Sequence, residues 1–211
     1  RPPAAAPNVL IVLLDDVGFG ASSVFGGPIR TPTAERLAAD GLSYTRFHTT
    51  AMCSTTRASM HTGRNHHAVG MGCLSNFDSG FPGYRGKIAH DAPLLSELLR
   101  PHGYRNYMVG KWHCTPLTQT GPTGPFDGWP LGRGFDRFYG TIHGAGSFFD
   151  PNSLTRDNRY ITPENDPEYQ PEGTWYYTDA ISDNTARYIR EHAEHHKDEP
   201  FFHYVAYTAA H

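Results

Sequence analysis

Residues 8–16 have the sequence Asn8-Val9-Leu10-Ile11-Val12-Leu13-Leu14-Asp15-Asp16, an apolar run that ends at two aspartates. Apolar side chains at successive positions are typical of a strand covered on both faces, as in the centre of a parallel sheet. Two adjacent carboxylates repel each other unless a cation lies between them, and their oxygens suit Ca²⁺ or Mg²⁺. We therefore predict a buried strand followed by a candidate cation site. The alternative is a turn in which one aspartate caps and the other is solvated.

Helical and extended patterns alternate along the rest of the chain. We predict helices over residues 31–41, 54–62, 92–100 and 179–197, and strands over residues 42–48, 104–109 and 200–207. This alternation indicates an α/β fold with a mixed, mainly parallel sheet flanked by helices. Residues 115–170 are rich in Gly, Pro, Asp and aromatic residues, so we predict a loop-rich insertion there. Residues 1–7 are predicted to be a flexible leader.

The composition sets limits on the function. The 211 residues are 38% hydrophobic and 18% charged, which suffices for one sizeable core. The net charge of -3 gives no overall basic field, so we expect neither a nucleic-acid nor a membrane partner. Three cysteines do not form a closed disulfide framework and lack zinc-ligand spacing. We predict a cytoplasmic location, or a periplasmic or secreted one if a signal peptide has been removed.

Cys53 is predicted to lie at the start of the helix over 54–62. The N-terminus of a helix offers unpaired N–H groups and a positive dipole end, which favour a tetrahedral anion such as sulfate or phosphate. Arg57 lies one helical turn later on the same face. The alternative for Cys53 is a buried thiol without a function, and the alternative for Arg57 is a surface ion pair.

Two further strands are followed by groups that suit an anion site. Lys111 and His113 come after the strand over 104–109, and alternation sends both side chains to the same side. A lysine can hold an anion oxygen, and a histidine can give or accept a proton. His211 follows the last predicted strand by four residues. Because ligands bind at the carboxyl ends of strands in α/β sheets, these groups are expected to meet.

The stretch from Cys53 to Arg64, Cys-Ser-Thr-Thr-Arg-Ala-Ser-Met-His-Thr-Gly-Arg, resembles the signature of the sulfatase family. That signature is Cys-x-Pro-x-Arg followed by a helix that ends in Thr-Gly-Arg. The resemblance extends upstream to Asp15-Asp16 and downstream to Gly110-Lys111-Trp112-His113. One departure is Thr55, which stands where the family has proline. Because that proline helps the maturation enzyme to recognise the cysteine, the departure bears on whether Cys53 is modified.

The resemblance implies an arylsulfatase-like enzyme of the alkaline phosphatase superfamily. A formylglycine-generating enzyme would oxidise Cys53 to formylglycine (3-oxoalanine), whose hydrate is the nucleophile. One hydroxyl, acidified by the cation, would attack the sulfur of a small-molecule sulfate ester in line with the leaving alcohol. The second hydroxyl would then lose its proton, and sulfate would leave as the aldehyde reforms. The catalytic residues implied are Cys53, Arg57, Lys111, His113 and His211, and the ligands of Ca²⁺ (or Mg²⁺) implied are Asp15, Asp16 and residue 53.

The resemblance covers residues 8–211 as the N-terminal part of such a catalytic domain. The family's remaining cation ligands, an Asp-Asn pair, and a second active-site lysine have no counterpart in this sequence. We therefore expect that the missing C-terminal half is needed to complete the site, and that this chain alone binds metal weakly and turns over little substrate.

Three other functions stay open. A phosphonate monoester or phosphodiester hydrolase of the same fold would use the same motif. A phosphoryl-transfer enzyme would use Thr55 or Thr56 as the nucleophile and leave Cys53 unmodified. A non-catalytic anion-binding or interaction domain would also keep the thiol, and Thr55 is its best support.

Overall fold

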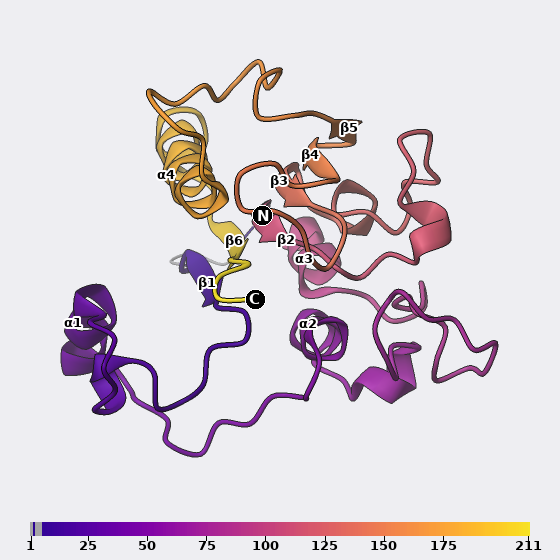
Figure 1. Cartoon of the computed structure of the whole chain (residues 1–211), viewed down its shortest axis with the longest axis horizontal. Coiled ribbons are helices and arrows are strands. Elements are labelled where there is room, and N and C mark those ends of the chain that lie inside the picture. Colours follow the sequence, from indigo (N-terminus) through magenta and orange to yellow (C-terminus); the bar gives the residue numbers. More distant parts are fainter. Residues whose placement is uncertain (1, 3–5) are drawn as a thin grey trace.

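The computed structural model describes residue 2 and residues 6–211, so residues 1 and 3–5 of the predicted leader lie outside the described residues. The chain forms one six-stranded sheet with the order β1-β6-β2-β3-β4-β5 (Figure 1). The first four strands in this order are parallel, and β4 and β5 are antiparallel to their neighbours. The predicted fold class, a mixed and mainly parallel sheet flanked by helices, is confirmed.

The strands are β1 (Val9–Leu13), β2 (Arg105–Lys111), β3 (Arg137–Thr141), β4 (Leu154–Arg156), β5 (Arg159–Tyr160) and β6 (Phe201–Ala206). The helices are α1 (Pro32–Asp40), α2 (Cys53–Thr62), α3 (Leu95–Leu99) and α4 (Tyr177–His195). The sequence thus predicted seven elements to within a few residues: the helices over 31–41, 54–62, 92–100 and 179–197, and the strands that begin near residues 8, 104 and 200. Helix α3 is shorter than expected.

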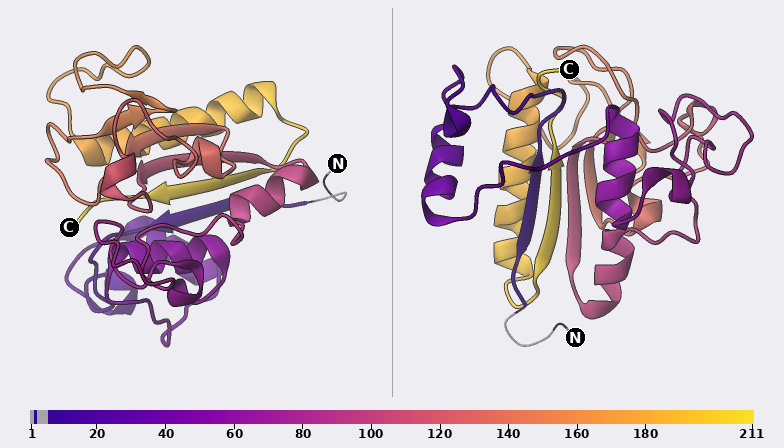
Figure 2. Two further views of the ribbon diagram at one scale, coloured as in Figure 1. Left: turned by 90° about the vertical axis from the view of Figure 1, so that its right-hand side faces the viewer. Right: turned by 90° about the horizontal axis from the view of Figure 1, so that it is seen from below.

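The sheet is the middle of three layers, with α4 on one face and α2 and α3 on the other (Figure 2). Successive residues of β2 point to opposite cores, as the pleat of a strand requires. Met108 packs into the core under α2 and α3, whereas Val109 packs into the core under α4. Because β2 is paired on both edges and covered on both faces, all its residues after Arg105 are buried, and its last residue, Lys111, is fully buried.

Strand β1 lies at one edge of the sheet and is covered on one face only. Val9, Ile11 and Leu13 pack against the core under α2 and α3. Leu10 and Val12 pair in register with His203 and Val205, which lie on the α4 face. Helix α4 contacts β2, β3 and β6 but does not extend over β1, so Leu10 and Val12 remain about half exposed.

Two sequence predictions were wrong. The predicted strand Leu42–His48 is irregular and exposed, with Leu42 at 85% exposure, because no other described strand pairs with it. The segment 115–170 is loop-rich, but it is not only an insertion, since it contains β3, β4 and β5. Strand β3 was missed because its sequence, Arg-Phe-Tyr-Gly-Thr, is short and contains a glycine. That glycine is required: a Cβ on Gly140 would lie 1.9 Å from the carbonyl oxygen of Gly110 on β2.

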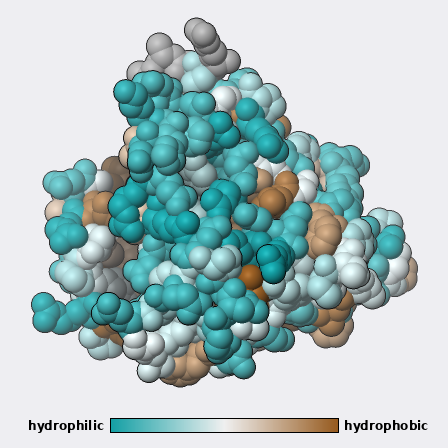
Figure 3. Space-filling view, turned by 90° about the horizontal axis from the view of Figure 1, so that it is seen from above, coloured by the Kyte–Doolittle hydropathy of each residue, from teal (hydrophilic) through white to brown (hydrophobic). Residues whose placement is uncertain are grey.

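Among the residues that the structure describes, no helix is long and apolar enough to cross a membrane. From the side where α4 and the segment after β5 lie, the surface is mainly hydrophilic, with small separate hydrophobic areas (Figure 3). The predicted cytoplasmic location stays a prediction.

Candidate active site

Three parallel strands bring the predicted site residues together at the carboxyl-terminal ends of the strands. Asp15 follows β1, Lys111 ends β2, and His211 lies five residues after the end of β6. The segment that carries His211 is bonded to the one that carries Asp15: the Asp15 N–H donates to Ala209 O at 3.0 Å, and the Ala210 N–H donates to Asp15 O at 2.7 Å. His211 is therefore held at the site, although it is the last residue of the chain described.

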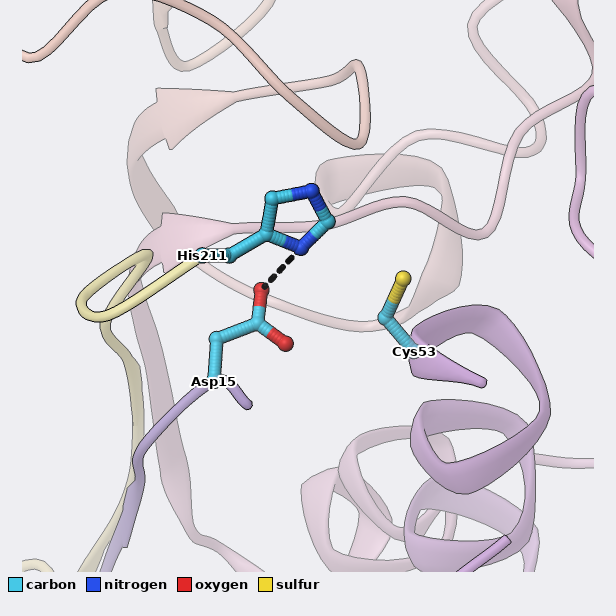
Figure 4. A group of neighbouring side chains, drawn as sticks. All are labelled: Asp15, Cys53 and His211. Atoms are coloured by element: carbon cyan, nitrogen blue, oxygen red, sulfur yellow. Dashed lines mark ion pairs between the residues drawn. The ribbon is translucent and has the colours of Figure 1, made fainter. Parts of the chain in front are cut away.

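Cys53 lies at the start of a helix, as predicted, and reaches the same ends of the strands from there. It does not follow a strand, because the segment before it is irregular; it is the first residue of α2. The N-cap residue Met52 makes no side-chain capping bond, so the first-turn N–H groups are not taken by a cap side chain. Figure 4 shows the Cys53 side chain pointing from the start of α2 toward Asp15 and His211. One ligand atom from each of these three residues lies within 4.8 Å of the others.

A buried charge cluster lies beneath Cys53. The Lys111 ammonium donates a hydrogen bond to Asp15 Oδ2, and Arg57 Nη2 lies 3.5 Å from the same oxygen. Arg57 Nη1 also donates to the carbonyl oxygen of Lys111 at 2.6 Å. All three side chains are at least 95% buried. Two cations thus share one carboxylate, and the residual positive charge favours an anion at this position.

Arg57 retains unused donor capacity. Its Nε and Nη2 groups are buried and have no hydrogen-bond partner among the described residues. A buried guanidinium donor without an acceptor costs free energy, because it has lost its water and gained nothing in return.

His113 is placed directly against Cys53. Its Nδ1 lies 3.2 Å from Cys53 Sγ, and its Nε2 lies 2.8 Å from Oδ1 of Asn76. The backbone of His113 has φ 51, a region that non-glycine residues rarely adopt and that often marks a functional site. Burial, followed by the positive charges of Lys111 and Arg57, lowers the pKa of His113 to about 3. The imidazole is therefore neutral at pH 7, with a proton on one ring nitrogen and a lone pair on the other.

His211 and Asp16 form the outer, solvent-facing part of the site. His211 Nδ1 lies 3.1 Å from Asp16 Oδ2 and 3.7 Å from Asp15 Oδ2. It also lies 3.4 Å from the Lys111 ammonium. The Asp16 side chain is 64% exposed, and its backbone has φ 55. The two aspartates, adjacent in sequence, thus have different surroundings.

Asn76 was not predicted from the sequence. It lies on the loop after α2, and nothing in its neighbours Ser75 and Phe77 marks it as a site residue. Only the return of this loop to α2, where the Ser75 N–H donates to Ser54 Oγ at 3.1 Å, brings Asn76 next to His113. Polar residues in the loop after a helix are too common for such a pattern to identify Asn76 as a site residue.

Thr55, at the position of the family's proline, is fully buried. Its hydroxyl donates to Met52 O at 2.8 Å and is hydrogen-bonded to the Thr50 hydroxyl. The Thr56 hydroxyl lies 2.7 Å from the same Thr50 oxygen. Both threonine hydroxyls, at 55 and 56, therefore take part in hydrogen bonds that hold the turn before α2.

The chain matches known proteins over almost its whole length. The sulfatase family model matches residues 7–211. An uncharacterized sulfatase of Schizosaccharomyces pombe is 32% identical over 97% of this chain. The human N-acetylgalactosamine-6-sulfatase is also 32% identical over 97% of this chain, and the arylsulfatase of Klebsiella aerogenes is 28% identical over 97%. The crystal structure of Ps i-CgsB has 28% sequence identity and a TM-score of 0.70, covering 97% of this chain.

The matched region is only part of each of these proteins. It spans 38% of the yeast protein, 40% of the human protein and 43% of the bacterial one, and 45% of the chain of Ps i-CgsB. The matched residues include the buried cluster, the start of α2 and the end of β2. On the family match and these identities, the chain belongs to the sulfatase family.

Proposed function

We propose that this chain provides the nucleophile-bearing part of an active site that hydrolyses sulfate esters. The observation that carries the proposal is the position of Cys53, at the start of α2 and above two buried cations that share one carboxylate. This arrangement combines a reactive side chain, helix N–H groups and excess positive charge around one point. A tetrahedral dianion such as the sulfate group of an ester matches each of these features.

The side chains around residue 53 have distinct roles in this proposal. Formylglycine, once formed at position 53, supplies a hydrated aldehyde as the nucleophile. Arg57 lies one turn along α2 and neutralises negative charge on residue 53. Lys111, and His211 beside it, hold sulfate oxygens, whereas His113 Nδ1 accepts a proton from residue 53.

A divalent cation, Ca²⁺ or Mg²⁺, fits the acidic side of the site. Oδ1 of Asp15 has no hydrogen-bond partner among the described residues, and the Asp16 carboxylate is open to solvent. Together with an oxygen on residue 53 these groups give a hard, oxygen-rich ligand set, and the cation would increase the acidity of that oxygen. Three ligands are fewer than the six to eight that Ca²⁺ takes. We expect the others to come from the part of the relatives' length that this chain does not cover.

Metal binding is tested by thermal unfolding of the chain with and without Ca²⁺. At a Ca²⁺ concentration 100 times the dissociation constant, the folded state should gain about 2.7 kcal/mol. The Asp16→Asn variant should lose most of this gain without a change in its stability in EDTA. An equal gain in wild type and variant would contradict the assignment of Asp16.

Maturation and chemistry are tested together. The chain is produced with a formylglycine-generating enzyme, and the tryptic peptide from Phe47 to Arg57 is weighed by mass spectrometry. We expect an aldehyde in place of the Cys53 thiol and slow release of sulfate from an aryl sulfate, since the chain alone lacks part of the site, with Cys53→Ala inactive. An intact thiol in the presence of the maturation enzyme would refute the proposal.

A serine at position 53 separates binding from turnover. Cys53→Ser has one hydroxyl and lacks the second one needed to expel sulfate, so a covalently sulfated serine should accumulate and be visible by mass spectrometry. This readout does not require turnover. The matured wild-type chain is also assayed with an aryl phosphonate ester. Preferential hydrolysis of that ester over the aryl sulfate would favour the phosphonate and phosphodiester hydrolase alternative.

A further inference from the structure

The imidazole of His113 is held on three sides. Cys53 Sγ lies 3.2 Å from its Nδ1, and Asn76 Oδ1 lies 2.8 Å from its Nε2. Gly144, on the loop after β3, closes the third side: a Cβ at this position would lie 2.1 Å from Cε1 of the ring. Only a residue without a side chain leaves room for the imidazole here, so a side chain at position 144 would displace the ring.

The backbone that carries each of these partners is also anchored. The His113 N–H donates to Ile142 O at 3.1 Å, two residues before Gly144, which extends the pairing of β2 with β3 beyond the strand ends. The loop that carries Asn76 is bonded through Ser75 to Ser54, the residue next to Cys53. Asn76 and Cys53 are therefore held at a set separation on either side of the ring.

A neutral imidazole carries one proton, and the partner of one nitrogen determines where that proton lies. The carbonyl oxygen of the Asn76 side chain can only accept, so the Nε2 that faces it must carry the proton. The lone pair then lies on Nδ1, toward residue 53. With this orientation of the Asn76 amide, the opposite tautomer would place two acceptors 2.8 Å apart, and the amide would have to turn over to present its NH2 group.

We propose that Asn76 is a positioning residue that sets the tautomer of His113, so that Nδ1 presents its lone pair to residue 53. Asn76 acts through His113 and does not itself contact residue 53. The catalytic consequence rests on the proposed sulfate-ester hydrolysis, in which His113 must accept a proton from residue 53 and not donate one. Removal of the Asn76 acceptor would leave the tautomers free to exchange and reduce the fraction of molecules ready to react.

The first test reads the tautomer directly. The chain is labelled with ¹⁵N-histidine, and long-range ¹H–¹⁵N spectra are recorded at pH 8, with the His113 signals identified by their loss in His113→Gln. We expect the Nε2–H form in wild type and a mixture in Asn76→Leu, which keeps the size of the side chain but removes the acceptor. Asn76→Asp can only accept, so it should keep the Nε2–H form. Phe77→Leu, an exposed neighbour on the same loop, is the matched control.

The second test measures turnover of the matured enzyme on an aryl sulfate. Asn76→Leu should lower kcat by about 10- to 100-fold, as is usual for a partner of a catalytic group, with KM unchanged. Asn76→Asp should recover most of kcat, which a merely structural role of the asparagine would not predict. Thermal unfolding should show Asn76→Leu as stable as Phe77→Leu, because both side chains are exposed.

The two proposals fail in different ways. An unchanged tautomer in Asn76→Leu, a tautomer lost in Asn76→Asp, or an unchanged kcat in Asn76→Leu would each overturn the role of Asn76. If the tautomers respond as expected but the matured wild type hydrolyses no sulfate ester, the proposed function fails while the control of the His113 tautomer by Asn76 stands.

Discussion

The two sides of the site differ in how the protein supports them. One side, made by α2 and the end of β2, is buried: Arg57, Lys111 and His113 are all at most 5% exposed, and each bonds to another part of the chain. The other side, made by β1 and the segment that leads to α2, exposes large apolar side chains. Leu10, Val12, Leu42, Tyr44 and Phe47 are each between 49% and 85% exposed.

The difference follows from the topology of the sheet. Strand β2 lies between β6 and β3 with a helix layer on each face, so its side chains are packed whichever way they point. Strand β1 has one neighbour and one covered face. Arg57, Lys111 and His113 thus lie on the buried side, whereas His211, also proposed to hold a sulfate oxygen, is 37% exposed and lies beside Asp16. Of the two aspartates proposed for the cation, Asp15 is buried against Lys111 and Arg57, whereas Asp16 is solvated.

The largest effect is expected at the contact between the two sides. Asp15→Asn removes the one carboxylate that Arg57 and Lys111 share and leaves two buried cations without a counter-charge. We expect a loss of about 3–5 kcal/mol in the free energy of unfolding, because breaking a buried ion pair leaves the remaining charge desolvated. Asp16→Asn, at the adjacent exposed position, should cost less than about 0.5 kcal/mol. Urea unfolding of the two variants compares them, and equal losses would contradict the distinction.

The next largest effect is a difference in stability between substitutions in β2 and in β1. Met108→Ala in β2 should cost about 2–5 kcal/mol, since it leaves a cavity in a core that is closed on all sides. Leu10→Ala in β1 removes a half-exposed side chain and should cost about 1 kcal/mol or less. Chemical denaturation gives both values. A large loss in Leu10→Ala would mean that the outer face of β1 is covered in solution.

The pH dependence of the free energy of unfolding should reflect the burial of His203 in β6. Burial lowers the pKa of His203 from the usual 6.5 to about 3, and neither ring nitrogen has a hydrogen-bond partner among the described residues. Between pH 6.5 and 3 the unfolded chain therefore binds the extra proton and the folded chain does not. This contribution to stability is complete above pH 6.5 and falls by about 1.4 kcal/mol per pH unit below it.

His203→Phe should remove that part of the slope when unfolding is measured at pH 7, 6 and 5. His195→Phe, at an exposed position of α4, is the matched control for replacing a histidine by phenylalanine. A slope unaffected by His203→Phe would indicate that water reaches this core.

The smallest effect concerns the turn before Cys53. Thr55→Val removes a hydroxyl that bonds to Met52 O and Thr50, at a cost of about 1 kcal/mol. Thr55→Pro should cost no more than about 1 kcal/mol either, because proline is tolerated in the first turn of a helix. The two variants should differ in maturation: we expect more aldehyde at position 53 in Thr55→Pro. Equal conversion in both would show that the turn, and not the proline, determines recognition.

Much of the fold could be predicted where the local pattern agreed with its surroundings. The apolar run of β1, the cap and glycine around α1, and the long amphipathic α4 carry signals within one segment. Residues 42–48 alternate like a strand but have no partner in the described structure, and β3 forms despite a glycine because β2 provides an edge for it. A strand depends on its neighbour, and a pattern within one segment does not show whether a neighbour exists.

The same division holds for the site. The sequence by itself determined the chemistry of the groups, since acidic pairs, a cysteine before a helix, and Lys111 and His113 after a strand are patterns of adjacent residues. Only the tertiary structure decided which atoms meet. It joins Asp15 to Lys111 across 96 positions and His113 to Asn76 across 37, and it makes one aspartate of a pair buried and the other exposed. The physical reason is that burial and hydrogen-bond direction depend on groups far away in the chain, which no local spacing specifies.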